Sequence, residues 1–362
     1  MKKPIVPSNG PKPVGPYTPG LLCGDFLYAS GQGSRSASGG DMPTDFPTQV
    51  RNSLHNVRLI VEASGMAMKD IVYSQVYLAD MNQFAGLAAL WKEAFPEGGP
   101  SFSVLGVTRM PTETPVEISA VAAKDATRPH GDVREAGGRL YFSGVVGATP
   151  AAAMDNLAKT AKAAGIDLGH FAFVNAYCAG VTLAQLNEVY GPFFDAGNAP
   201  ARASMLVDSL PPGVGVELTG VSVRDLSARR VVRPRNMAPS RTSSPAVWAG
   251  DTLYLSAKSG FIPGPNAGIY GTTVEQQVRQ TMRNLLDGLE ETGLDFSHCV
   301  AANVYVDDLT EFAKMNGVYG SYFKADPPTR TTVQPMKPVE RKATAAGTFP
   351  MLEQVSLVAW KG

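Results

Sequence analysis

The sequence predicts a mixed α/β (α+β) fold made of three tandem copies of one β-β-α-β-α-β-β unit. The segments CGDFLYASGQ, GGRLYFSGVV and AGDTLYLSAK each join a glycine turn to an aromatic-rich strand and a serine. The three serines, Ser30, Ser143 and Ser256, recur at equal spacing. Self-similarity at a fixed period indicates that one supersecondary unit is repeated.

The elements of each unit follow in the same order. After the serine strand comes an amphipathic helix: VRNSLHNVRLIVEASG, AMDNLAKTAKAAG or VRQTMRNLLDGLEETG. Apolar residues at positions i, i+3 or i+4 and i+7 give each helix one buried face. The strands that follow align on Tyr77, Tyr177 and Tyr305.

A second helix and two further strands complete each unit. The second helix carries aligned aromatic residues that we expect in the core: Trp91, Tyr190, Tyr319, Phe95, Phe194 and Phe323. The last strands are VEISAVAA, VELTGVSV and LEQVSLVA. We therefore expect units at 1–125, 126–228 and 229–362. The segment 224–244 carries six arginines and is interpreted as a solvated linker leading into the third unit.

Composition argues against several function classes. Lys+Arg and Asp+Glu each number 32 among 362 residues, so no overall charge attracts nucleic acid or an anionic membrane. No stretch approaches about 20 apolar residues, and no leader pattern begins the chain, so a cytoplasmic protein without membrane contact is expected. The three cysteines and four histidines are scattered, which predicts no metal site.

Two stretches resemble a known family. VGPYTPGLLCGDFLYASGQ is similar to the opening of the RidA/YjgF family of imine and enamine deaminases, and APARASMLV followed by LPPGVGVELTGVSV resembles its closing signature. The resemblance implies chorismate mutase-like trimers with ligand clefts between subunits and no cofactor. Because one chain holds three units, we expect a monomer that acts as an intramolecular pseudo-trimer.

An arginine in the repeated motif suits a carboxylate ligand. Arg202 in APARASM and Arg330 in PPTRTTV both follow a proline and precede small or β-branched residues. A guanidinium stays charged and binds a carboxylate through two parallel hydrogen bonds. By resemblance, this arginine holds a small 2-imino or 2-enamino acid. The residues two positions later, where the family has cysteine, are Ser204 and Thr332. A structural pairing of each arginine with a glutamate is the alternative.

Carrying the family pattern over gives three unequal sets of residues. The second unit matches at Arg202, Glu217, Ser143 and Gly144, and His130 takes the place of the family tyrosine. The third matches at Arg330, Glu353 and Ser256, with Ser243 in the tyrosine place. The first unit forms a possible degenerate site, because it lacks the arginine. Its residues are Tyr17, Ser30, Gly31, Phe102 and Glu117.

The sequence thus favours hydrolytic deamination of small carboxylate-bearing imines, with Glu217 and Glu353 as the catalytic residues that orient water and transfer a proton. A non-catalytic carboxylate-binding or regulatory protein remains open because Phe102, His130 and Ser243 depart from the pattern. RNA cleavage is a third alternative, which the balanced charge disfavours. Whether the chain is an enzyme, and on which imine, stays undecided at this point.

Overall fold

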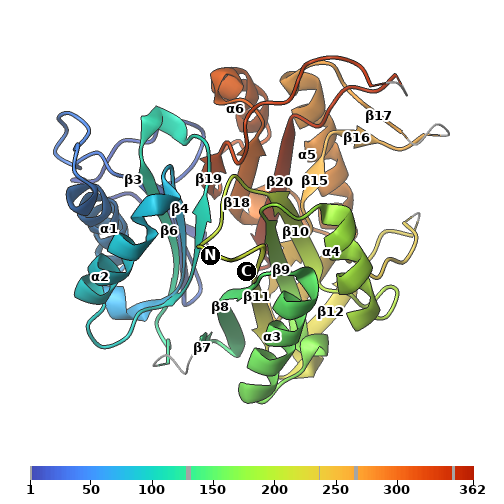
Figure 1. Ribbon diagram of the computed structural model, residues 1–362, viewed down its shortest axis with the longest axis horizontal. Helices are drawn as coiled ribbons and strands as arrows, with labels where there is room; N and C mark the ends of the chain where they lie inside the picture. The colour runs from blue at the N-terminus through green and yellow to red at the C-terminus, as the bar shows by residue number, and fades with distance from the viewer. Residues whose placement is uncertain (1, 128–131, 236, 265–267, 345–346) are drawn as a thin grey trace.

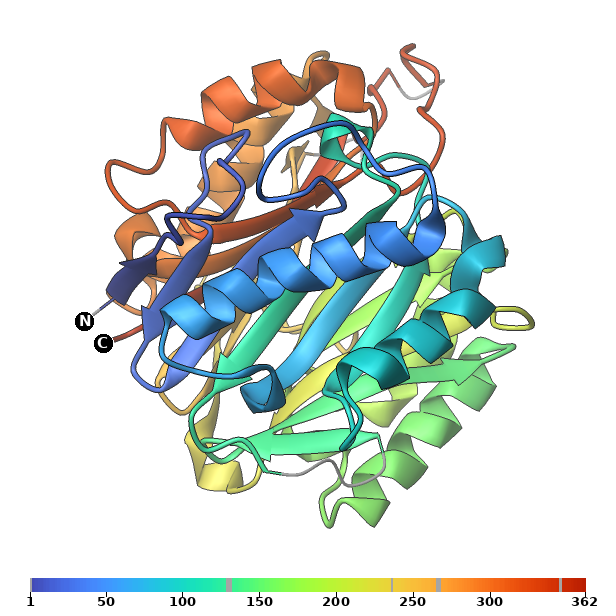
Figure 2. The same ribbon diagram turned by 90° about the vertical axis from the view of Figure 1, so that its left-hand side faces the viewer.

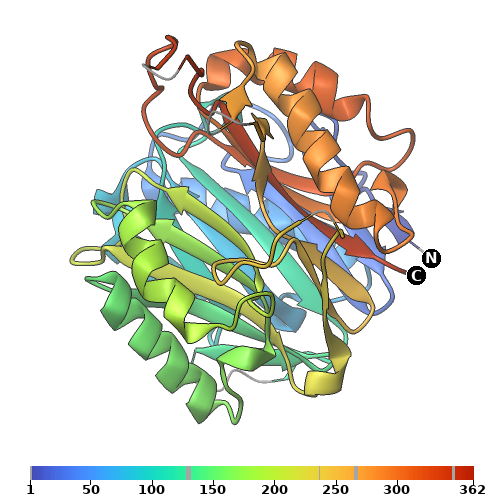
Figure 3. The same cartoon turned by 90° about the vertical axis from the view of Figure 1, so that its right-hand side faces the viewer.

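The computed structural model describes residues 2–127, 132–235, 237–264, 268–344 and 347–362. Three sheets face the middle of the molecule, and each carries its helices on the outside (Figure 1). Figures 2 and 3 show the same layering from two sides. The three units therefore surround a common centre, as the sequence predicts for a pseudo-trimer.

The first unit is a sheet of order β1-β2-β3-β6-β4-β5, in which β5 runs parallel to β4. Its strands are β1 (Lys2–Ile5), β2 (Gly20–Cys23), β3 (Phe26–Gly33), β4 (Ile71–Leu78), β5 (Ser101–Gly106) and β6 (Val116–Ala123). Its helices are α1 (Phe46–Ala63) and α2 (Phe84–Ala94). Helix α1 begins where the Asp45 side chain accepts a hydrogen bond from Thr48 N, which satisfies a donor of the first turn.

The second unit repeats this plan with strand order β10-β9-β11-β8-β7. Its strands are β7 (Val133–Ala136), β8 (Arg139–Gly147), β9 (Phe171–Cys178), β10 (Ala201–Leu206) and β11 (Val216–Val223), and its helices are α3 (Pro150–Ala163) and α4 (Leu183–Tyr190).

The third unit has the order β12-β13-β14-β20-β18-β19, with β15 also paired to β20. Its strands are β12 (Arg229–Val232), β13 (Ala246–Ala249), β14 (Thr252–Leu255), β15 (Lys258–Ser259), β18 (Cys299–Val306), β19 (Thr329–Val333) and β20 (Glu353–Trp360). A hairpin of β16 (Phe261–Ile262) and β17 (Ile269–Tyr270) precedes α5 (Val274–Glu290), and α6 (Phe312–Gly320) follows β18.

The arginine-rich segment 224–244 is more than a solvated linker. Its residues 229–232 form β12, which pairs with β13 as β1 pairs with β2. The Arg229 guanidinium donates to Phe171 O at 2.8 Å and to Asn198 Oδ1 at 2.7 Å. The arginine therefore ties the second unit to the start of the third, a role that residue composition alone does not reveal.

The repeated aromatic residues pack alike in all three units. Ring centroids lie 4.9 Å apart for Trp91 and Phe95, 4.8 Å for Tyr190 and Phe194, and 4.9 Å for Tyr319 and Phe323. All of these rings except the half-buried Phe323 are buried, so the predicted core assignment is confirmed for them.

The three units close on one another around the centre. Tyr77, Tyr177 and Tyr305 share one buried apolar cluster to which every unit contributes. The loops after β5, β10 and β19 are joined in a ring by backbone hydrogen bonds: Gly106 N to Ser209 O, Asp208 N to Pro335 O, and Thr108 N to Gln334 O. Among the residues described, no helix combines the length and apolar character needed to cross a membrane.

Candidate active site

One hydrogen bond recurs at each junction between units and shows which units share a cleft. The Ser30 Oγ accepts from Arg330 N at 2.9 Å, the Ser143 Oγ from Phe102 N at 3.2 Å, and the Ser256 Oγ from Arg202 N at 2.8 Å. We name the three junctions the Ser30, Ser143 and Ser256 clefts. Each combines the serine of one unit with the arginine position of another.

The matching residues that the sequence analysis grouped within one unit are therefore divided between two clefts. Arg330 meets the first unit's Ser30, whereas Arg202 lies in a different cleft from Ser143 and Glu217. The reason is the strand order. The arginine position lies on the edge strand β5, β10 or β19, while the glutamate position lies on the inner strand β6, β11 or β20 and the serine position lies on β3 or β8 or directly after β14. The edge strand is separated from the strand that carries the glutamate by two strand spacings, about 10 Å. Its arginine position therefore contributes to a cleft with the neighbouring unit.

The Ser30 cleft opens into a cavity of about 490 Å³. Its lining brings together Tyr17, Gly31, Glu117, Arg330 and Thr332. The first unit's residues, expected to be degenerate because Phe102 replaces an arginine, thus receive Arg330 from the third unit. The tyrosine, serine, glycine, glutamate and arginine of the family pattern meet in this one cleft, with Thr332 at the position of the family cysteine.

Arg330 is a buried cation with few protein partners. It is 4% exposed, and its only side-chain hydrogen bond to a described residue runs from Nη1 to Asn316 Oδ1 at 2.7 Å. Its guanidinium carbon lies 5.1 Å from the ring centroid of Tyr319 and 5.5 Å from that of Tyr17. It forms no ion pair with a described carboxylate. Burial lowers its pKa, but an arginine remains charged at neutral pH.

Glu117 faces the same cavity as an unengaged carboxyl. Its side chain accepts no hydrogen bond from the described residues, and burial raises its pKa to about 8 against the opposing charge of Arg330. A Cβ on Gly31 would lie 2.0 Å from Glu117 Oε1, so only glycine permits this approach. The Tyr17 hydroxyl accepts from Val14 N at 3.2 Å, and burial raises the pKa of Tyr17.

The Ser143 cleft keeps the glutamate but has no cation at the arginine position. Phe102 stacks on Trp91 with ring centroids 4.9 Å apart. Glu217 accepts a hydrogen bond from Ser103 Oγ, and burial raises the pKa of Glu217 to about 7. A Cβ on Gly144 would lie 2.3 Å from Glu217 Oε1. His130, expected in the tyrosine place of this set, lies outside the described residues.

The Ser256 cleft keeps the arginine. Arg202 is 9% exposed, its Nη2 donates to Asn187 Oδ1 at 2.6 Å, and its guanidinium carbon lies 4.5 Å from the Tyr190 ring centroid. Ser256 Oγ donates to Ser244 O as Ser30 Oγ donates to Thr18 O. Ser243, which precedes Ser244, therefore occupies the position of Tyr17.

Glu353 does not occupy the glutamate position of the Ser256 cleft. In the strand registers Tyr77 pairs with Glu117 and Tyr177 with Glu217, whereas Tyr305 pairs with Gln354. Successive side chains of a strand point to opposite faces, so a shift of one residue changes the face. The Glu353 carboxyl accepts a hydrogen bond from Thr281 Oγ1 of α5, and burial raises the pKa of Glu353 to about 8. The equivalent of Glu117 is the amide Gln354.

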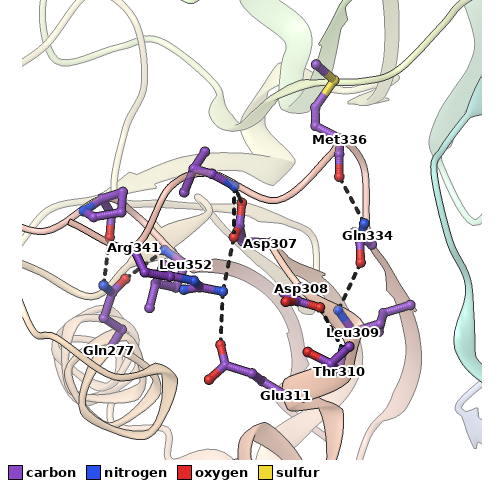
Figure 4. A network of polar contacts seen from close by, with 12 residues as sticks. Gln277, Asp307, Asp308, Leu309, Thr310, Glu311, Gln334, Met336, Arg341 and Leu352 are labelled. Carbon is purple, nitrogen blue, oxygen red and sulfur yellow. Dashed lines mark hydrogen bonds and ion pairs between the residues drawn. The ribbon is translucent and has the colours of Figure 1, made fainter.

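A second cavity, of about 190 Å³, adjoins the Ser256 cleft. Ser204 and Gln354 line it together with the segment that joins β19 to β20. A polar network holds this segment (Figure 4). Arg341 Nη2 pairs with Asp307 Oδ2 at 3.1 Å and with Glu311 Oε2 at 2.9 Å, and Leu352 N donates to Gln277 Oε1 at 2.8 Å.

Two asparagines that hold the guanidiniums, Asn187 and Asn316, were not predicted from the sequence. Each lies three residues before the aligned aromatic Tyr190 or Tyr319. The corresponding residue of the first unit is Ala88, three before Trp91, in the unit that has lost its arginine. Asparagine and arginine thus occur together in the second and third units and are both absent from the first, and this shared pattern could have identified the asparagines in the sequence. Within the described part of the chain, no three His, Cys, Asp or Glu side chains gather as a metal site would require.

Comparisons with known proteins agree with the repeated architecture. A family model described as Endoribonuclease L-PSP matches residues 7–124, 126–223 and 234–341. The 2-iminobutanoate/2-iminopropanoate deaminase of Escherichia coli (strain K12) is 37% identical over 127 residues, which are 34% of this chain and 99% of that protein. A RutC family protein of Pyrococcus horikoshii is 36% identical over 126 residues, 34% of this chain and 100% of that protein.

A part of the chain is also similar to solved structures. The crystal structure of the YjgF gene product from E. coli is 37% identical and covers 34% of this chain and 98% of its own, with a TM-score of 0.33. Because the family model matches three successive segments that span most of the sequence, the chain belongs to the Endoribonuclease L-PSP family, the RidA/YjgF family that its motifs resemble.

Proposed function

We propose that the Ser30 cleft hydrolyses small 2-imino and 2-enamino acids to 2-keto acids and ammonia. The observation that carries this proposal is that Arg330 and Glu117 line one cavity without forming an ion pair with each other. A buried cation and a buried carboxyl that do not engage each other leave room for a ligand between them. The E. coli relative named 2-iminobutanoate/2-iminopropanoate deaminase supports the choice of reaction.

Arg330 binds the substrate carboxylate in this proposal. Asn316 holds Nη1 and the rings of Tyr319 and Tyr17 flank the guanidinium, so its orientation is set before a ligand arrives. The remaining donors are suited to a bidentate contact with a carboxylate. A prearranged clamp reduces the entropy that substrate binding would otherwise cost.

Glu117 transfers the proton. With a pKa of about 8, both the acid and the carboxylate are present near neutral pH. The acid first protonates the imine nitrogen, and the resulting carboxylate takes a proton from water as the water oxygen attacks the imine carbon and the C=N π pair moves to nitrogen. The regenerated acid protonates the amine nitrogen, and the C–N bond breaks as the carboxylate takes the proton of the new hydroxyl group, so that the carbonyl forms and ammonia leaves. One water is consumed, and no oxidant or reductant is required. General acid–base catalysis of this kind contributes about 10²- to 10⁴-fold.

A matched pair of variants tests the proposal. The imine is generated in solution by an amino acid oxidase that acts on alanine or 2-aminobutanoate, and release of the keto acid is followed. Arg330→Ala should lose most of the acceleration, because a charge-assisted hydrogen bond contributes about 1.5 to 3 kcal/mol. Arg202→Ala removes the equivalent arginine from the Ser256 cleft and should retain turnover. Full turnover by Arg330→Ala would exclude the Ser30 cleft as the active site.

RNA cleavage has less support as a proposal, although the family description names an endoribonuclease. The chain has a net charge of zero, and no histidine lines the described part of the Ser30 cavity. A cytoplasmic location is part of our proposal and accords with the three free, buried cysteines, Cys23, Cys178 and Cys299.

A further inference from the structure

The first and third units meet at a junction that no connecting segment crosses. The chain runs from β6 into β7 between the first and second units, and from β11 into β12 between the second and third. The first and third units are not consecutive in the chain, so noncovalent contacts join them. The Ser30 cleft lies at this junction, because Arg330 N of the third unit donates to Ser30 Oγ of the first. The geometry of the cleft therefore depends on the contacts that hold these two units together.

The side chain of Lys2, on β1, crosses this junction. Its Nζ donates to three backbone carbonyls of the third unit: Ser297 O at 2.9 Å, Cys299 O at 3.2 Å and Asp326 O at 3.0 Å. An ammonium group has three donors, and each of them here has an oxygen partner. Figures 2 and 3 show the start of the chain beside the end of β20 in the third unit. A charged side chain of the first unit thus binds the backbone of the third.

The carbonyls that Lys2 binds belong to the segments that position Arg330. Cys299 is the first residue of β18, which pairs in parallel with β19, the strand that carries Arg330. Asp326 lies four residues before Arg330, where the chain approaches β19. Hydrogen bonds from a charged donor are stronger than those between neutral groups. Lys2 therefore helps to fix the place of Arg330 relative to Glu117 of the first unit.

The other two junctions contain an equivalent cation. Arg229 of the third unit donates to Phe171 O, at the first residue of β9, at 2.8 Å, and to Asn198 O, four residues before the arginine position of the second unit, at 2.7 Å. Arg134 of the second unit donates to Ile71 O, at the first residue of β4, at 2.6 Å. The cations come from β1, β7 and β12, yet they bind the same carbonyl of the neighbouring unit. This recurrence indicates that each junction requires a cation at this point.

We propose that Lys2 is a positioning residue of the Ser30 cleft, whose ammonium group closes the junction between the first and third units and sets Arg330 opposite Glu117. In the proposed reaction the third unit binds the substrate carboxylate and the first unit transfers the proton. A displacement of about 1 Å between such groups costs about 10²-fold in rate. Arg330 keeps Asn316 as a partner within its own unit, so loss of Lys2 should impair the chemical step more than substrate binding.

The expected effect of Lys2 on turnover rests on the proposed function. Its expected effect on the junction does not, because the three hydrogen bonds of Lys2 exist whatever ligand the cleft binds. The two effects are therefore measured separately.

Three variants of the full chain test the effect on turnover. Lys2→Met removes the charge and keeps the length of the side chain, and it should lower kcat for the imine about 10- to 100-fold with little change in KM. Lys2→Arg supplies the cation that the other junctions use and should retain kcat. Arg229→Met removes the equivalent cation from the Ser256 cleft and should also retain kcat, even if it melts at a lower temperature than wild type. Unchanged kcat in Lys2→Met, or an equal loss in Arg229→Met, would overturn the proposal.

Hydrogen exchange of the backbone amides tests the junction itself. The Arg330 amide is held by Ser30 Oγ and the Arg202 amide by Ser256 Oγ. Lys2→Met should speed exchange in the peptide 327–333 and leave the peptide 199–205 unchanged, whereas Arg229→Met should do the reverse. Unchanged exchange in 327–333 of Lys2→Met would refute closure of the junction by Lys2. If wild type hydrolyses no imine while this exchange is still faster, the proposed function fails and the closure of the junction by Lys2 stands.

Discussion

Phe102 and Gln354 each remove one member of the chemical pair that Arg330 and Glu117 form in the Ser30 cleft. Phe102 leaves Glu217 without a cation opposite, and Gln354 leaves Arg202 without a carboxyl. Of the three similar clefts, the Ser30 cleft is therefore the one that has an arginine at the arginine position and a glutamate at the glutamate position. The chemical differences lie in single side chains, because the backbone hydrogen bond to the serine is retained in all three.

Replacing Glu117 by Gln should abolish most turnover and change its pH dependence. Because burial raises the pKa of Glu117 to about 8, the wild-type rate should fall as the pH rises through that value and the proton donor is lost. Glu117→Gln should lose about 10²-fold or more and show no inflection there. Glu353→Gln is the matched control and should leave the pH–rate profile unchanged. Equal losses in both variants would contradict the assignment.

Glu353 should instead affect stability. Burial raises its pKa from the ordinary 4.5 to about 8, so between these values the folded chain holds a proton that the unfolded chain releases. Its contribution to stability is fully present below about pH 4.5 and is lost as the pH rises to about 8. Glu353→Gln should therefore melt at a higher temperature relative to wild type at pH 8 than at pH 5. The same difference in melting temperature at both pH values would argue against a raised pKa for Glu353.

At the scale of elements, strand pairing decides which side chains can react together. The sequence correctly predicted the β-β-α-β-α-β-β order that the units share and the aligned tyrosines, but it did not predict β1, β12 or the hairpin of β16 and β17. It did not predict that Arg330 and Glu117 line one cavity, because that arrangement depends on packing of the edge strand β19 against β3 of another unit. It also misplaced the third glutamate position by one residue. The segment between β19 and β20 obscures the register, and only the pairing of Tyr305 with Gln354 resolves it.

Restoring two residues should create activity in the Ser256 cleft. Ala257 stands in the place of Gly31. In an Arg330→Ala background, Ala257→Gly combined with Gln354→Glu supplies both the carboxyl and the space that a Cβ would occupy. We expect measurable imine hydrolysis, below the wild-type rate because Ser243 still stands in the place of Tyr17. Gln354→Glu alone should remain inactive, since Ala257 blocks the approach of the carboxyl. Equal activity in the single and double replacements would show that the glycine is not required.

At the scale of the whole molecule, the chain encloses its own trimer-like centre. The hydrogen-bonded ring of loops and the shared cluster of Tyr77, Tyr177 and Tyr305 are complete within one polypeptide. Sheet edges that a separate unit would expose pack against a neighbouring unit. We therefore propose that the three clefts form within a single chain.

Light scattering should therefore give the mass of one chain for the active species. A mass of two chains would be compatible with paired rings, provided that turnover per chain is unchanged on dilution. A mass of three chains, or turnover per chain that falls on dilution below the dissociation constant, would show that the clefts are completed between molecules.

Covalent linkage of the units also changes what a mutation can do. In a ring of identical subunits, one codon specifies the same side chain three times, so a substitution that removes the clamp removes it from every cleft. Here residues 102, 202 and 330 are encoded separately, and only the first has become apolar. Because the three units are linked in one chain, the residues of each cleft can change independently of those in the other two. A homotrimer encoded by a single gene changes all three clefts at once.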